Sequence, residues 1–106
     1  MTFDVVVTAR AESDLERIGD WLHERSPDGA MCWLAAASAA ITGLASSPRR
    51  HSPAPENEFS DREVRNVLFK TRRGRIYRAV FYIEDATVVV THIRGPRQRP
   101  LKKGEF

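Results

Sequence analysis

The spacing of apolar residues changes near residue 63, and this change limits the possible folds more than any other feature of the chain. Before it, apolar residues recur every three or four positions in two stretches, at 11–22 and 30–44, as on the buried faces of helices. After it come three β-rich runs, at 64–70, 76–83 and 87–94, separated by short turns. Helices that precede a run of strands predict an α+β fold.

Local signals define where these elements begin and end. Phe3, Val5 and Val7 alternate with their neighbours and predict a short opening strand. Thr8 is predicted to cap a first helix, and Ser26-Pro27-Asp28 is predicted to start a second one. Because few residues separate the two helices, we expect them to form an antiparallel hairpin. Pro48 is expected to end the second helix. We therefore expect the order β-α-α-β-β-β, with an N-terminal strand and a two-helix hairpin packed on one face of a small antiparallel sheet.

Alternation along the strands assigns the two faces of this sheet. Tyr77, Ala79, Phe81 and Ile83 form the better core face, which the helices should cover. Arg78 then points to the open face, and His92 and Arg94 share one face of the last strand.

The chain of 106 residues suits a single domain spanning 1–106. Three of the six prolines fall in 46–63, which we expect to be a long loop, and 101–106 is expected to be a flexible tail. No run of residues is apolar enough to span a membrane and no secretory signal is evident, so the expected compartment is the cytoplasm.

Charge is segregated along the chain. Residues 1–48 carry three basic and seven acidic side chains, whereas 64–104 carry eleven basic side chains against Glu84 and Asp85. The densest basic clusters are Arg72-Arg73-Gly74-Arg75 and Arg97-Gln98-Arg99. The basic segment 64–104 either attracts polyanions or an acidic partner protein, or is a solvated surface.

The residues that could carry chemistry are arginines, whose planar donors suit phosphate groups. The open face and the strand ends offer Arg65, Arg78, Arg94, Arg97 and Arg99 as a surface for a target or a nucleic acid. Metal-free RNA cleavage would also need an acid and a base. The candidates for these two groups are His92, Tyr82, Tyr77 and His51, each of which is also explained by packing or hydrogen bonding.

Other chemistries have little support. Cys32 lies in an alanine-rich helix and is interpreted as a packing residue. Trp21 and Trp33 are interpreted as packing residues as well, with a role in a protein interface as the alternative. One cysteine and three scattered histidines do not make a Cys-rich zinc site, and no dinucleotide or phosphate-loop motif is present. We expect no metal and no cofactor.

From Val5 to Leu101 the chain resembles the RelE/ParE superfamily of toxins from type II toxin–antitoxin modules. The first helix, within 7–18, is similar to an "A..DL..I" pattern, 64–69 is similar to an "R.L" strand, and 77–82 is similar to "YR..Y". The last strand with its basic tail, 90–99, completes the resemblance. The family fold is a helical hairpin on a small antiparallel sheet.

The resemblance implies two modes of action. ParE-like members inhibit DNA gyrase by binding it and are not enzymes, whereas RelE-like members are ribosome-dependent endoribonucleases that cut mRNA. In the second mode, Arg78 would hold the phosphate, and Arg97 would stabilise the transition state or protonate the leaving group. His92 would substitute for the tyrosine or histidine that many RelE-like enzymes carry in the C-terminal segment. The ParE-like mode is favoured because the first helix fits it and because no Tyr or His follows Arg99.

Both modes imply a cognate antitoxin protein and a toxin–antitoxin hetero-oligomer. The antitoxin would order a flexible segment along the groove between helices and sheet, with acidic and apolar residues covering the arginines. A third alternative is a non-toxic relic that only binds the antitoxin.

Overall fold

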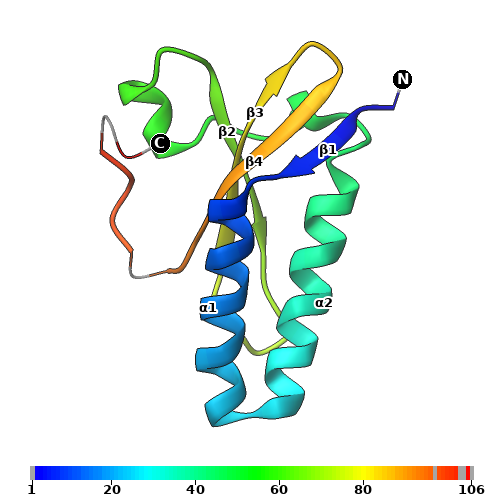
Figure 1. Ribbon diagram of the computed structural model, residues 1–106, viewed down its shortest axis with the longest axis vertical. Helices are drawn as coiled ribbons and strands as arrows, with labels where there is room; N and C mark the ends of the chain where they lie inside the picture. The colour runs from blue at the N-terminus through cyan, green and yellow to red at the C-terminus, as the bar shows by residue number, and fades with distance from the viewer. Residues whose placement is uncertain (1, 97, 103–104, 106) are drawn as a thin grey trace.

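The sheet of the protein is mixed, because its N-terminal strand joins it in the parallel direction. The computed structural model describes residues 2–96, 98–102 and 105. Its elements are β1 (Asp4–Val7), α1 (Ala9–Arg25), α2 (Pro27–Gly43), β2 (Val64–Phe69), β3 (Tyr77–Glu84) and β4 (Thr87–Arg94). The strand order is β1-β4-β3-β2, with β1 parallel to β4 and the other pairs antiparallel (Figure 1). The α+β fold and the order β-α-α-β-β-β are confirmed, and the parallel pairing of β1 is an addition to them.

The two helices form a hairpin because single residues cap them at closely spaced positions. The Thr8 hydroxyl accepts a hydrogen bond from the Ala11 N–H, at 3.2 Å, at the start of α1. Ser26 is the last cap of α1, where its N–H donates to the Leu22 carbonyl oxygen. It is also the first cap of α2, where its hydroxyl accepts a hydrogen bond from the Gly29 N–H at 3.0 Å. Both predicted caps are confirmed. The predicted end at Pro48 is wrong, since α2 stops at Gly43 and Pro48 instead begins a short 3-10 helix, η1 (Pro48–Arg50).

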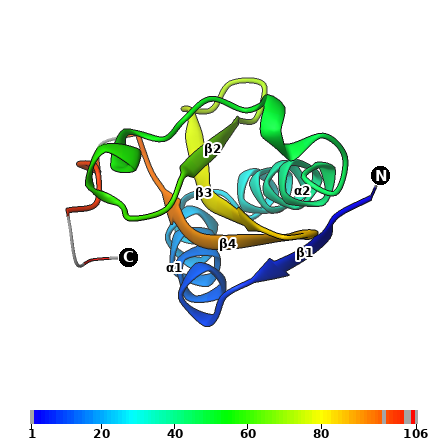
Figure 2. The ribbon, with the colours of Figure 1, turned by 90° about the horizontal axis from the view of Figure 1, so that it is seen from above.

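The main core lies between this hairpin and one face of the sheet (Figure 2). α1 contacts β4 and α2 contacts β2, so the two helices together span the sheet. Ala79 and Phe81 are fully buried in this core, as the alternation along β3 predicts. Burying a side chain of the size of Phe81 contributes about 1.5–3 kcal/mol, so this face dominates the stability of the fold.

A buried carboxylate also ties α1 to β4. Asp14 accepts a hydrogen bond from the Ile93 N–H, at 3.0 Å, and forms ion pairs with Arg10 and Arg17, each at 3.0 Å. Burial raises the pKa of Asp14, but these three hydrogen bonds outweigh it and hold the pKa below its ordinary value. Asp14 is therefore ionised near neutral pH and fixes the depth at which α1 packs on the sheet.

A bulge in the pairing of β3 with β4 sets the faces of the last strand. Val80 pairs with His92 but Phe81 pairs with Val90, so Thr91 is the extra residue. Val90 and Ile93 can therefore both face the core, and both are fully buried. His92 is thereby directed to the side of the sheet away from the helices.

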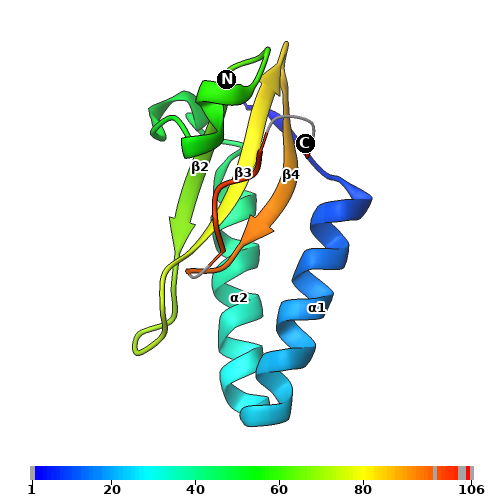
Figure 3. The same ribbon diagram turned by 90° about the vertical axis from the view of Figure 1, so that its left-hand side faces the viewer.

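That second side of the sheet is covered rather than open. The segment 46–63 contains η1 and a further 3-10 helix, η2 (Pro55–Phe59), and its Ala54 packs with Val64 and Val80 in a second apolar cluster. The C-terminal segment crosses the same face (Figure 3), where Leu101 is buried. The expectation of an open face was therefore wrong, and Leu101 belongs to the packed structure although we expected it to begin a tail.

Among the described residues, no helix combines the length and the apolar character that a membrane crossing requires. Cys32 is exposed on α2, so the interpretation of this residue as a packing side chain is wrong.

Candidate functional site

Arg78 lies on the covered side of the sheet, where a carboxylate of the protein itself occupies its donors. Both guanidinium Nη atoms donate to Glu56, one to each carboxylate oxygen, at 2.6 Å. The side chain of Arg78 is 14% exposed and that of Glu56 is 0% exposed. Such a two-point pair is the geometry with which arginine also binds phosphate. The two guanidinium donors of Arg78 that could bind a target phosphate are thus already bound to Glu56 of the same chain.

Glu56 is also the point at which the loop and the C-terminal segment meet. Its second carboxylate oxygen accepts a hydrogen bond from the Leu101 N–H, at 2.8 Å. Burial raises the pKa of Glu56, but the hydrogen bonds from Arg78 and Leu101 outweigh it and hold the pKa below its ordinary value. The carboxylate is therefore ionised near neutral pH and binds the two segments to β3.

The two candidates on β4 lie on the same covered face. His92 is 3% exposed, and burial, assisted by the charge of Arg10, lowers its pKa. Arg94 is also buried, and its Nη2 donates to the Arg99 carbonyl oxygen at 2.6 Å. The register confirms that His92 and Arg94 share a face with Arg78.

The remaining predicted arginines are separated from this group. Arg65 pairs with Phe81 in the sheet register, so it lies on the opposite face from Arg78, where it donates to the His51 carbonyl oxygen and pairs with Glu63. Arg99 forms an exposed two-point pair with Glu105, at 2.8 and 3.1 Å, and this pair lowers the pKa of Glu105 to about 2. Arg97 lies outside the described residues.

These positions correct the expected display of arginines on one exposed side of the sheet. Arg65, Arg78 and Arg99 pair with carboxylates of the chain itself, and Arg94 is buried against a backbone carbonyl. The physical reason is that loop 46–63 and the C-terminal segment bring acidic and carbonyl oxygens over the sheet, and a buried guanidinium must be paired.

The other acid–base candidates serve packing. Tyr77 contacts the Trp33 ring edge-on at 5.2 Å and the Phe69 ring at 6.1 Å. Tyr82 is half-buried beneath the guanidinium of Arg62, at 4.2 Å. The ring of His51 lies edge-on to the buried ring of Phe81, at 6.0 Å, and burial lowers its pKa.

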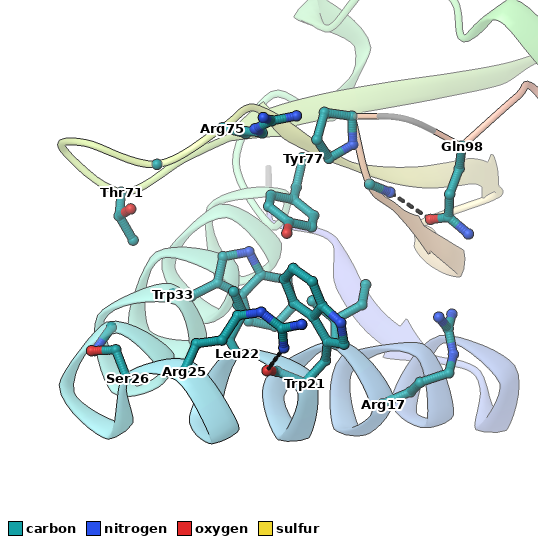
Figure 4. Close-up of a pocket in the computed structure, with 15 residues that line it drawn as sticks. Arg17, Trp21, Leu22, Arg25, Ser26, Trp33, Thr71, Arg75, Tyr77 and Gln98 are labelled. Atoms are coloured by element: carbon teal, nitrogen blue, oxygen red, sulfur yellow. Dashed lines mark hydrogen bonds between the residues drawn. The ribbon is translucent and has the colours of Figure 1, made fainter.

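A second site is a groove of about 820 Å³ beside the helical hairpin, in the region between helices and sheet where the sequence analysis expects an antitoxin segment. We call it the hairpin groove, and it is bounded by α1, the start of α2, the β2–β3 turn and the residues Gly95, Pro96 and Gln98 (Figure 4). Its floor is aromatic, because Trp33 is only 3% exposed and lies against Tyr77. Trp21, by contrast, is 51% exposed and presents its indole ring to the groove.

Arginines surround this apolar floor. Arg17, Arg25 and Arg75 all line the hairpin groove. The guanidinium of Arg25 lies 3.6 Å from the centroid of the Trp21 ring and donates to the Trp21 carbonyl oxygen at 2.8 Å. An aromatic surface flanked by cations has the character of a site for an amphipathic peptide segment with acidic residues.

The described residues contain no group of three or more His, Cys, Asp or Glu side chains that could hold a metal ion.

Comparison with known proteins identifies the class to which this fold and these surfaces belong. A family model described as the ParE toxin of the type II toxin–antitoxin system, parDE, matches residues 5–100. The protein is therefore a toxin component of the type II class, as its helical hairpin on a small sheet also indicates. Within that class the chain belongs to the ParE toxin family.

A solved structure shares this fold. It is described as the chromosomal ParDE toxin–antitoxin system from P. aeruginosa, and the similarity covers 89% of this chain and 96% of that chain with a TM-score of 0.68. The sequence identity is 18%, so this likeness concerns the fold. No curated protein sequence matches the chain.

Proposed function

We propose that the protein arrests growth by binding DNA gyrase and that it does so without catalysing a reaction. Membership of the ParE family supports this target. The choice of a non-catalytic mechanism rests on the ion pair between Arg78 and Glu56. Both Nη atoms of Arg78, which a ribonuclease would use to bind phosphate, already donate to the Glu56 carboxylate.

The alternative, a ribosome-dependent ribonuclease, receives less support from the same face. Its proposed proton-transfer residue, His92, is 3% exposed beneath the covering segments, and Arg78 is 14% exposed. A phosphodiester would have to displace Glu56 from Arg78 before either side chain could act. Displacing it would leave Glu56 buried without its partner, which is costly.

The hairpin groove is the proposed binding site for a segment of the cognate antitoxin. The half-exposed ring of Trp21 offers apolar area beside the buried Trp33, and Arg17, Arg25 and Arg75, which line the same groove, offer charge to acidic residues. A flexible segment that folds on binding fits such a groove, and the resting state in the cytoplasm would then be a hetero-oligomer of toxin and antitoxin.

A supercoiling assay with purified toxin and gyrase tests the proposed target. Inhibition at micromolar toxin is expected, with the same inhibition by a R78A variant that remains folded. Unaffected gyrase would overturn the proposal.

Mapping of mRNA 5′ ends after induced expression distinguishes the ribonuclease alternative from gyrase inhibition. Cuts within translated codons, abolished by R78A, would establish a ribonuclease instead. Normal growth during induction without the antitoxin would identify a relic that only binds its partner.

A further inference from the structure

The turn between β2 and β3 carries a cluster of four basic side chains. Lys70, Arg72, Arg73 and Arg75 are all exposed there. Among the described residues, no carboxylate forms an ion pair with any of the four. Figure 3 shows this yellow-green turn projecting beyond the paired ends of β2 and β3, alongside the helical hairpin. We call these four side chains the basic tip.

Several arginines elsewhere in the described structure have local partners. Arg10 and Arg17 pair with Asp14, Arg25 stacks on Trp21, and the sheet arginines are engaged as described above. The guanidinium of Arg49 lies over the Phe3 ring, at 5.2 Å from its centroid. The charges of the basic tip therefore remain available to an external anion, whereas those on the sheet do not.

The turn itself is well defined. The Gly74 N–H donates to the Thr71 carbonyl oxygen at 3.1 Å, which closes a four-residue turn around Arg72 and Arg73. Its two strands are paired up to Phe69 and Tyr77. The backbone of this turn is thus already folded before binding, so that only the four long side chains have to be ordered when they contact a partner.

We propose that the basic tip binds the phosphate backbone of double-stranded DNA. Four cations within six residues form a compact patch of positive charge, which is attracted to a duplex because the duplex carries about one negative charge per 1.7 Å of helix axis. Arginine also binds phosphate oxygens at two points. Residues 70–75 contain no aromatic side chain on which single-stranded bases could stack, so a duplex fits better than a single strand.

The proposal goes beyond gyrase inhibition and does not depend on gyrase as the target. It predicts contacts with the phosphate backbone, whose charge the cations of the tip neutralise. Binding should therefore be independent of sequence and strongly dependent on salt.

Fluorescence anisotropy of a short labelled DNA duplex with the full-length toxin tests the proposal. Four phosphate contacts give a slope of about −3.6 in log K against log salt, so affinity should fall about 150-fold between roughly 50 and 200 mM salt. The variant R72Q/R73Q should halve the slope to about −1.8 and lose only about 12-fold over the same range.

The matched control is R49Q/R50Q, which removes two charges from another exposed arginine pair. It should keep the slope of the wild type. Equal losses in both variants would show a general charge effect and overturn the proposal. So would an absence of binding, or tighter binding to poly-glutamate, to single-stranded RNA or to anionic phosphatidylglycerol vesicles than to the duplex.

Discussion

Replacing Glu56 by alanine should destabilise the fold more than most single substitutions. The change would leave the guanidinium of Arg78, which is 14% exposed, without its carboxylate. It would also remove the acceptor of the Leu101 N–H. Removing one partner of a buried ion pair costs about 3–5 kcal/mol, which is a large part of the stability of a small domain. Glu56→Gln keeps an acceptor but loses the charge, and we expect a cost of about 1.5–3 kcal/mol.

Urea unfolding followed by tryptophan fluorescence measures these differences, because Trp33 is buried in the core. The control is Glu58→Ala, which removes an exposed carboxylate from the same short helix and should change stability by less than about 0.5 kcal/mol. The double variant E56L/R78M removes both charges and should recover most of the loss. A Glu56→Ala variant as stable as the control, or a double variant no better than the single one, would refute the view that this pair holds the loop on the sheet.

Three further predictions concern pH, the hairpin groove and the core. The pKa values of Asp14 and Glu56 are lowered in the folded state, so the stability that these groups contribute is present above their unfolded values of about 4 and is lost as the pH falls through the folded values; urea midpoints that stay constant from neutral pH to pH ~2 would contradict this. Trp21→Ala should weaken binding of the antitoxin segment by about 2 kcal/mol or more in calorimetry, whereas Met31→Ala, at an exposed position outside the groove, should leave it unchanged; equal affinities would exclude the groove as the docking site. Ala11→Leu should cost about 1–3 kcal/mol in the same unfolding assay, because Ala11 is fully buried, and a neutral result would mean that this contact can relax.

The local part of the fold could be predicted from the sequence because its signals lie within a few residues of one another. The caps at Thr8 and Ser26 and the alternation along β3 are confirmed by hydrogen bonds and burial. The parallel pairing of β1 with β4 could not be predicted in this way, since it joins segments about 80 residues apart in the chain. The alternation of apolar residues identifies a strand, but it does not determine with which other strand that strand pairs.

The candidate site was harder to predict for a similar reason. Glu56 lies in a proline-containing loop, 22 residues before the arginine it pairs with, and no local pattern connects the two. Counting charges along the chain treats every guanidinium as free, so it could not separate the occupied Arg78 from the exposed Arg72. Trp21 has the spacing of a packing residue on α1, yet its ring stays half-exposed beside the hairpin groove.

The central position of β4 has a consequence for how the toxin acquires its shape during translation. β1 and β3 both hydrogen-bond to β4, and Asp14 on α1 accepts from Ile93 within it. A nascent chain that has emerged only as far as Glu84 therefore has a helical hairpin but no strand against which β1 can lie. Assembly of the complete sheet, and with it the docking of β1 and of Asp14 on α1, therefore waits until Arg94 has emerged.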